Sequence, residues 1–362
     1  MNISLKNKTI CLIIPSLRHG GAERVISILA NEWSKNSDTK VNILLLTKQD
    51  KFYDISKKVN IIEPNKLYSK NVISKLFYTL WVLLFIRKKI NSLKPDSILS
   101  FCECYNNLVL LSLWKTDNKI FVSDRNNPNN FIGVFHEFLR KKLYKNATGI
   151  IAQTETAKKI LIKKTNNRNI KVIPNPLREI IHHKEEISKN IILNVGRFEI
   201  QKNQKELIEI FSLLKNKENW KLILLGEGSL KSELVSLVEK LQLQNHVEIL
   251  DFQYDIDAYF QQAKIFAFTS IYEGFPNALS EAMANGLASI AYDCPTGPSE
   301  LIENNINGLL IPLYNKEEYV KNLDRLIIDN AFRDKIGIEA LKVNDKLSVS
   351  KIALDYLRFI SK

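Results

Sequence analysis

The sequence predicts an α/β protein built from two open parallel sheets, each covered by helices. Short apolar runs alternate with longer stretches of helical period along most of the chain, which is the pattern of parallel strands joined by helices. The apolar runs are continuous, as expected for strands buried on both faces. With 362 residues, the chain is too long for one ordinary core and fits two domains of roughly 170 residues each. We therefore expect two doubly wound domains that face a cleft.

Taken in order, the apolar runs form two groups of predicted strands. The first group comprises residues 10–14, 41–46, 97–101, 120–123 and 150–152. The second comprises residues 191–195, 222–225, 247–250, 265–269 and 288–292. Helical patterns separate several of these runs, so we expect parallel pairing within each group.

Two prolines mark the boundary between the groups. Pro174 and Pro176 interrupt regular structure, and the next apolar run begins at Ile191. We therefore expect an N-terminal domain over residues 1–175 and a C-terminal domain over residues 176–345. A last segment, residues 346–362, contains a helical pattern that could pack on either domain.

The composition is that of a folded protein with reduced cysteines. Hydrophobic residues make up 45% of the chain and charged residues 25%, close to the averages for soluble domains. Cys102 and Cys104 are separated by one residue, whereas zinc knuckles usually have two. The apolar run at residues 10–14 is followed at once by Pro15, which favours a buried strand over a signal peptide. Residues 77–86 form the longest apolar stretch, about half of a membrane span, so we expect a cytosolic protein without a transmembrane helix.

Positive charge is concentrated in the first half of the chain. Residues 1–180 contain 31 Lys and Arg against 13 Asp and Glu, whereas residues 181–362 contain 21 against 26. The first half therefore suits an anionic partner, which could be nucleic acid, an anionic membrane or a phosphorylated acceptor.

Two basic segments in this half resemble membrane-surface helices. Residues 71–94 combine large apolar side chains with three consecutive cations, and a second helix near Phe138 adds four more; the cations are Arg87, Lys88, Lys89, Arg140, Lys141, Lys142 and Lys145. Such helices can lie in an anionic membrane interface. A core helix with a solvated basic end explains residues 71–94 equally well. The charge asymmetry favours peripheral membrane contact.

Glycine-containing loops follow three of the predicted strands, where doubly wound sheets bind ligands. Gly20 and Gly21 open a helix and let backbone N–H groups approach a phosphate. A plain glycine turn is the alternative, because the glycine spacing is that of neither a dinucleotide-binding fold nor a P-loop. Gly196 and Arg197 precede Lys202 and a helix from about residue 204; the two cations can bind phosphate oxygens, or the loop can be merely solvated. Gly226 makes a further tight turn at the same edge.

The segment from Glu273 to Glu281 is the most informative part of the sequence. Glu273 lies in the loop after residue 269, and Glu281 lies just over one turn into a helix that starts near Pro276 and Asn277. One carboxylate can accept sugar hydroxyls and the other ribose hydroxyls. We expect Glu281 to line the surface of the site, so that replacing it would leave the fold intact.

Glu273 and Glu281 match the E-x7-E pattern of the retaining GT-B glycosyltransferases of family 4. Gly196-Arg197 with Lys202, the turn at Gly226, and Asn307-Gly308-Leu309 resemble that family in the same order and at similar spacing. Residues 20–24 resemble its N-terminal loop. The resemblance covers nearly the whole chain.

The resemblance implies two Rossmann-like domains, with the acceptor held by the first and a nucleotide sugar by the second, and a final helix that returns to the first. Arg197 and Lys202 are expected to hold the diphosphate, Glu281 the ribose and Glu273 the sugar hydroxyls, so that Glu273, Arg197 and Lys202 form the catalytic group. The donor site implied is Gly196, Arg197, Lys202, Gly226, Phe252, Gln253, Glu273, Gly274, Phe275, Pro276, Asn277, Ala278, Leu279 and Glu281. Phe252 and Gln253 would meet the base.

No metal is expected, because cations would stabilise the leaving diphosphate. Asp255-Ile256-Asp257 spells the D-x-D of metal-dependent transferases, but it precedes a helix and is better explained as an N-cap. Many family members carry a histidine after an N-terminal strand; here Asp124, Arg125 and Asn126 stand there, and with Gly20 and Gly21 they form the expected acceptor side. A similar element occurs in relatives that add N-acetylhexosamine to polyprenyl-diphosphate-linked or other surface glycans. His19 and His136 are alternative cleft residues, or structural ones.

The resemblance thus predicts a retaining, metal-independent glycosyltransferase without a cofactor. It would move a hexose or N-acetylhexosamine from a nucleotide sugar, with UDP expected, to a lipid-linked or surface-glycan acceptor in the synthesis of a polysaccharide such as lipopolysaccharide, capsule or O-antigen. The expected location is the cytoplasm, peripheral on the inner face of the plasma membrane, with an anionic membrane surface as a partner. A GT-B nucleotide-sugar epimerase is the alternative. A basic nucleic-acid-binding protein is a weaker one, since no nucleic-acid motif accompanies the charge.

Overall fold

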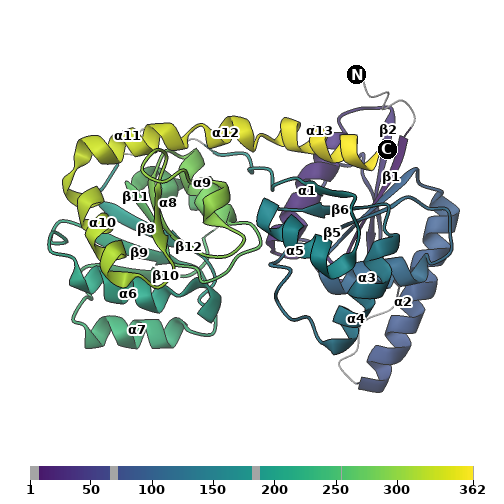
Figure 1. The fold of residues 1–362 in the computed structure, drawn as a ribbon, viewed down its shortest axis with the longest axis horizontal. Helices are drawn as coiled ribbons and strands as arrows, with labels where there is room; N and C mark the ends of the chain where they lie inside the picture. Colours follow the sequence, from purple (N-terminus) through teal and green to yellow (C-terminus); the bar gives the residue numbers. More distant parts are fainter. Residues whose placement is uncertain (1–7, 66–71, 182–187, 254, 362) are drawn as a thin grey trace. The chain divides into compact units, whose positions relative to one another are not determined.

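The computed structural model describes residues 8–65, 72–181, 188–253 and 255–361. It divides the chain into two compact units (Figure 1): unit 1 is Met1–Pro176 with Leu347–Lys362, and unit 2 is Leu177–Lys346. Asn71, the first residue of the expected basic segment, and Lys362, the last residue of the C-terminal segment, lie outside the described residues.

Unit 1 is built on a seven-stranded sheet with the order β3-β2-β1-β4-β5-β6-β7. All neighbouring strands are parallel. The strands are β1 (Lys8–Ile14), β2 (Thr39–Leu45), β3 (Asn60–Ile62), β4 (Ser97–Phe101), β5 (Ile120–Ser123), β6 (Gly149–Ala152) and β7 (Ile170–Val172). The central strands are buried along their full length, as continuous apolar runs require.

Helices cover both faces of this sheet (Figure 1). They are α1 (Gly21–Trp33), α2 (Val72–Leu93), α3 (Glu103–Ser112), α4 (Val134–Leu143) with the 3₁₀ turn η1 (Tyr144–Asn146), α5 (Glu155–Thr165) and α13 (Val349–Ile360). Helix α3 contacts both α2 and α4, and α13 packs on α1. The indole Nε1 of Trp33 donates a hydrogen bond to the carbonyl oxygen of Ala353 (3.0 Å), so the C-terminal helix is part of unit 1.

Unit 2 is built on a six-stranded parallel sheet with the order β10-β9-β8-β11-β12-β13. The strands are β8 (Ile191–Val195), β9 (Lys221–Leu225), β10 (Val247–Leu250), β11 (Ile265–Phe268), β12 (Ala288–Asp293) and β13 (Leu309–Pro312). The helices are α6 (Gln204–Leu213), α7 (Lys231–Lys240), α8 (Ile256–Gln262), α9 (Asn277–Ala284), α10 (Lys316–Ile328), α11 (Asn330–Ala340) and α12 (Val343–Lys346), with the 3₁₀ turns η2 (Ile200–Lys202) and η3 (Pro298–Glu300).

The ten strands that the apolar runs predict are all present, with ends that shift by at most two residues. Three further strands, β3, β7 and β13, were not predicted. Each has three or four residues and lies at the edge of its sheet. Edge strands are buried less and need shorter apolar runs, so their sequences carry little signal.

Both sheets reverse their strand order beside the first strand. The reversal lies between β1 and β4 in unit 1 and between β8 and β11 in unit 2. At such a switch point the loops after the two strands lead to opposite faces, and ligands bind at the carboxyl ends of the strands between them. Three of the predicted site loops follow strands at these switch points: β1, β8 and β11.

Candidate active site

The loops after β8 and β11 meet at the switch point of unit 2. The ammonium nitrogen of Lys202, in η2, lies 2.6 Å from Oε1 of Glu273, in the loop between β11 and α9. These side chains are 17% and 6% exposed. A charge-assisted bond in such a partly buried place fixes both groups. The switch point therefore presents one cation beside one carboxylate.

Hydrogen bonds from one backbone group and two side chains hold these two loops together. The Ile271 N–H donates to the carbonyl oxygen of Gln201 (2.9 Å), and the Gln201 side-chain amide donates to the carbonyl oxygen of Tyr272 (2.9 Å) and to Oε2 of Glu273 (3.4 Å). Thr269 donates to the carbonyl oxygens of Lys202 and Asn203 (both 3.1 Å). The position of Glu273 is thus set by the loop after β8 as much as by its own.

Glu281 occupies a separate buried cluster on α9. Its Oε2 accepts a bond from Nε of Arg178 (3.4 Å), while the other guanidinium nitrogens bind both carboxylate oxygens of Asp257 at 2.7 and 2.6 Å. Burial opposes the charge of Arg178, but the hydrogen bonds that it donates to Asp257 and the charge of Glu281 raise its pKa above the ordinary value. Glu281 is 4% exposed, so the expectation that it lines the surface is wrong: it is a buried, paired carboxylate.

The glycine turns bring the backbones after β8 and β9 into contact. A Cβ on Gly226 would lie 2.1 Å from the carbonyl oxygen of Gly196, a backbone atom that cannot move aside. The Gly196 N–H donates to the carbonyl oxygen of Leu225 (3.0 Å). Arg197, between these turns and η2, is exposed and has no ion pair with any described residue. Its guanidinium is therefore available at this edge.

The remaining predicted donor residues lie at the same edge of the sheet. Phe252 and Gln253 follow β10 and are half-buried; Gln253 donates to the carbonyl oxygen of Asp251 (3.2 Å). The run Gly274, Phe275, Pro276, Asn277, Ala278 and Leu279 leads into α9, which begins at Asn277. Its N-terminus adds a partial positive charge.

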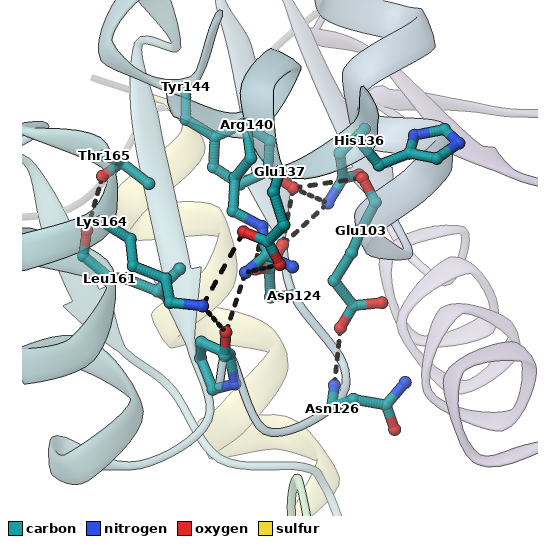
Figure 2. Close-up of polar contacts among 12 residues, drawn as sticks. Glu103, Asp124, Asn126, His136, Glu137, Arg140, Tyr144, Leu161, Lys164 and Thr165 are labelled. Atoms are coloured by element: carbon teal, nitrogen blue, oxygen red, sulfur yellow. Dashed lines mark hydrogen bonds and ion pairs between the residues drawn. The ribbon is translucent and has the colours of Figure 1, made fainter. Parts of the chain in front are cut away.

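In unit 1, Asp124 follows β5, is almost completely buried and lies among the polar side chains of Figure 2. The Tyr144 hydroxyl donates to Oδ1 of Asp124 (2.7 Å), and Asn106 donates to the same oxygen (3.3 Å). Nε of Arg140 lies 4.0 Å from Oδ2. Burial raises the pKa of the Asp124 carboxyl to about 6, and the charge of Glu103 adds to this effect, against the opposing charge of Arg140.

The two residues after Asp124 are held by their own contacts. Oε1 of Glu103 accepts the backbone N–H groups of Arg125 and Asn126, both at 2.7 Å; Figure 2 shows the bond to Asn126. The buried guanidinium of Arg125 donates to Asn175 and to the hydroxyl of Tyr356 (3.1 Å). Of the three predicted acceptor-side residues in this loop, Asn126 is the one whose side chain is exposed.

The loop of Gly20 and Gly21 borders two adjoining hollows at the carboxyl ends of β1 and β2. The first, of ≈ 400 Å³, is lined by Pro15, Ser16, Arg18, His19, Glu23, Thr47, Gln49 and Tyr105. The second, of ≈ 660 Å³, is lined by Arg18, Lys48, Gln49, Asp50, Lys51 and Glu63. Gly20 packs under the side chain of Glu23. Arg18 lines both hollows, whereas Lys51 in the second is paired with Glu63 (2.6 Å), so the exposed Arg18 is the cation that both hollows offer to an anionic group.

Sequence reasoning missed Arg178, Gln201 and Glu103. Arg178 is 79 and 103 residues away from its two partners, a separation that no local pattern can reveal. The N-cap predicted for Asp255-Ile256-Asp257 is confirmed for Asp255, whose side chain caps α8 by accepting the Ala258 N–H. The same prediction did not give a role to Asp257, whose carboxylate pairs with Arg178.

His136 lies on α4 beside Asn107, which donates to its carbonyl oxygen (3.0 Å). Burial lowers the pKa of His136. Across the described parts of the chain, no group of three His, Cys, Asp or Glu could hold a metal ion. No helix among the residues with described positions is long and apolar enough to span a membrane.

A family model described as glycosyl transferases group 1 matches residues 178–343. An uncharacterised glycosyltransferase of Methanocaldococcus jannaschii is 33% identical over 325 residues, which are 80% of this chain and 79% of that protein. The N-acetylgalactosamine-N,N'-diacetylbacillosaminyl-diphospho-undecaprenol 4-alpha-N-acetylgalactosaminyltransferase of Campylobacter jejuni is 29% identical over 366 residues, covering 96% of this chain and 98% of that one.

The fold matches that of an Anabaena protein, HepE, whose crystal structure contains UDP and glucose. The TM-score is 0.79 at 18% sequence identity, and the match covers 98% of this chain and 99% of the other. Together with the two parallel-sheet units, this likeness confirms the predicted GT-B fold class.

Proposed function

The chain belongs to the glycosyl transferases of group 1, and from this membership we propose that it is a retaining, metal-independent transferase of a hexose or N-acetylhexosamine. The proposed donor is a UDP-sugar, and the proposed acceptor is a lipid-linked or surface-glycan saccharide in bacterial polysaccharide synthesis. Two similarities support these choices: the Campylobacter relative is named for a diphospho-undecaprenol-linked acceptor, and HepE was crystallised with UDP.

The observation that carries the proposal is the pairing of Lys202 with Glu273 at the switch point of unit 2. We assign Arg197 and Lys202 to the diphosphate, where negative charge accumulates as the sugar departs. The adjacent carboxylate of Glu273 would accept hydroxyls of the departing sugar. Glu281, one turn into α9, would accept the ribose hydroxyls, and the loop of Phe252 and Gln253 would meet the base.

The proposed acceptor side is the carboxyl edge of unit 1. Arg18 suits an acceptor phosphate, since it lines both hollows beside Gly20 and Gly21. We assign Asp124 and Arg125 a positioning role, because both are buried and bonded within the unit. The exposed Asn126 is the residue of that loop assigned to the acceptor.

A panel of nucleotide sugars screened by thermal shift tests the donor assignment. A ligand at a hundredfold its dissociation constant adds about 2.7 kcal/mol to the free energy of unfolding, so the correct donor should raise Tm by several degrees while mismatched nucleotides do not. With that donor and an undecaprenyl-diphosphate-linked acceptor, transfer should persist in EDTA. Strict dependence on Mg²⁺ or Mn²⁺ would refute the metal-independent assignment.

The anomeric configuration of the product tests retention. NMR should show the same configuration in product and donor. An inverted product would reject the retaining assignment, and release of an epimerised sugar without acceptor would favour the epimerase alternative.

A further inference from the structure

We propose that unit 1 docks on an anionic lipid bilayer through the exposed apolar turns of α2 and α4. The docking surface consists of Leu76, Leu80 and Leu84 on α2 and Val134, Phe135 and Phe138 on α4. Each of these side chains is more than half exposed, from 51% for Leu80 to 79% for Val134. Large apolar side chains gathered on one surface mark an interaction site.

Helix α2 is apolar on two faces. Tyr78, Val82, Ile86 and Ile90 pack into the core of unit 1, as on any helix that covers a sheet. Leu76, Leu80 and Leu84 follow one another at four-residue spacing and form an outward ridge. A surface helix of a soluble protein carries polar residues on that side, so the ridge is unexplained by the fold of unit 1.

The apolar turns of the two helices lie at the same edge of unit 1. Both helices follow strands of a parallel sheet, so both begin at its carboxyl edge, and α3 lies between them in contact with each. Figure 1 shows both helices beginning on the lower side of unit 1. Two separate apolar ridges thereby lie at one edge of unit 1, one on either side of α3.

Exposed cations begin about one turn beyond the apolar residues in each helix. Arg87 and Lys88 follow Leu84 on α2, and Lys141 and Lys142 follow Phe138 on α4. Helix α2 contains no acidic residue, and the one acid of α4, Glu137, forms ion pairs with Arg140 and Lys164. An apolar band bordered by cations matches a membrane interface, where apolar side chains enter the acyl boundary and cations meet lipid phosphates.

Charge favours a bilayer over a second copy of the chain. The net charge is +13, and this edge of unit 1 is basic on both helices, so two copies would repel one another here. An anionic bilayer complements both the apolar and the basic bands. The surface also shares the carboxyl edge with the hollows assigned to the acceptor, which extends the proposed function: a lipid-linked diphosphate would reach the protein from the membrane plane.

Vesicle binding tests this inference without donor or acceptor, so its failure is distinguishable from failure of the proposed function. The full chain is sedimented with vesicles of phosphatidylcholine alone and with vesicles of equal parts phosphatidylcholine and phosphatidylglycerol. We expect stronger binding to the anionic vesicles, weakened by high salt. Absence of binding to both compositions would overturn the proposal, whatever the protein does with nucleotide sugars.

Matched variants separate the apolar and basic contributions. The double variant Leu80→Ser, Phe135→Ser should lower the partition coefficient at least tenfold, because two apolar side chains no longer enter the interface. The control Ile328→Ser, Ile338→Ser removes side chains that are 63% and 65% exposed in unit 2 and should leave binding unchanged. Circular dichroism checks that each variant is folded.

The charge variant Lys88→Gln, Lys142→Gln should bind anionic vesicles several-fold less tightly and respond less to salt. Its control, Lys335→Gln with Lys346→Gln, removes the same charge from unit 2 and should bind like the wild type. Undiminished binding by the Leu80→Ser, Phe135→Ser variant would overturn the docking surface. A vesicle-free dimer that this variant dissociates would instead assign the surface to a second copy of the chain.

Discussion

The two carboxylates of the E-x7-E pattern have different partners, and this difference separates their roles. Glu273 meets Lys202 and Gln201, whereas Glu281 meets Arg178. A cation beside Glu273 suits the reacting end of a donor, while Glu281 is buried one turn into a helix. Both groups lie in one segment of nine residues, but their partners come from distant parts of unit 2.

Replacing Glu281 by glutamine should weaken UDP binding by about tenfold to a hundredfold, because a charge-assisted hydrogen bond to a ribose hydroxyl is lost. Glutamine is preferred to alanine, since its amide oxygen can still accept the bond from Nε of Arg178, whereas alanine would remove that acceptor from a partly buried guanidinium. Isothermal titration calorimetry with UDP measures the effect. Glu218→Gln, an exposed position before β9, is the matched control. Unchanged affinity in Glu281→Gln would reject the ribose assignment.

Asp124 should make stability depend on pH. The folded state holds the Asp124 proton up to about pH 6, whereas the ordinary value is 3.8. The folded state thus binds more protons between these values, and the free energy of unfolding falls as pH rises through this window, by up to ~3 kcal/mol. Asp124→Asn lacks this titration but keeps an oxygen for Tyr144.

Urea unfolding at about pH 4 and pH 7 measures this difference. Asp124→Asn should gain stability relative to the wild type between the two conditions. A stability difference that stays constant with pH would show that Asp124 keeps an ordinary pKa in the folded protein.

At the scale of elements, the site depends on how closely the turns after β8 and β9 approach each other. The two turns touch through Gly196 and Gly226, and each is bonded to the strand beside it. Glycine at position 226 is therefore required by a backbone contact between two segments 30 residues apart. The sequence showed the glycines but not that they meet.

Gly226→Ala should destabilise unit 2 by about 1–3 kcal/mol and weaken UDP binding, because the new methyl group forces the two turns apart. Gly196→Ala is the matched control: its methyl group would meet the flexible side chain of Lys202 at 3.3 Å and should be tolerated better. Thermal unfolding with and without UDP measures both. Equal effects of the two substitutions would contradict the close backbone approach.

At the scale of the whole molecule, unit 1 contains both the first and the last of the described segments. Helix α13 returns after the whole of unit 2, and the Phe359 ring packs edge-on against Phe121 of β5 with ring centroids 5.3 Å apart. Gly149 of β6 lies directly beneath the Phe359 ring. The last helix therefore completes the core of a unit whose other residues precede position 177.

Phe359→Ala should destabilise unit 1 by about 3–5 kcal/mol, the usual effect of emptying a buried phenylalanine site. Urea unfolding followed by tryptophan fluorescence reports this, since Trp33, Trp81 and Trp114 belong to unit 1. Leu354→Ala, on the same helix but 37% exposed, should have a much smaller effect. Similar losses in both variants would mean that helix propensity, rather than core packing, explains the result.

The sequence by itself determined the fold class, ten of the strands, and the segments that carry Gly196, Lys202, Glu273 and Glu281. These features are local: continuous apolar runs, glycine turns and a short acidic pattern are each complete within one segment. The same locality explains why residues 71–94 could be recognised as one basic, apolar segment but not assigned to the core or to the surface.

The tertiary structure alone decided which segments meet. It joined Arg178 to Glu281 and Asp257, buried Asp124 against Tyr144, and brought the outward ridges of α2 and α4 to one edge of unit 1. Such contacts depend on strand order and on the packing of helices across a sheet, which no single segment encodes. The local sequence pattern therefore identifies the residues of the site, whereas contacts between distant segments determine their electrostatic environment.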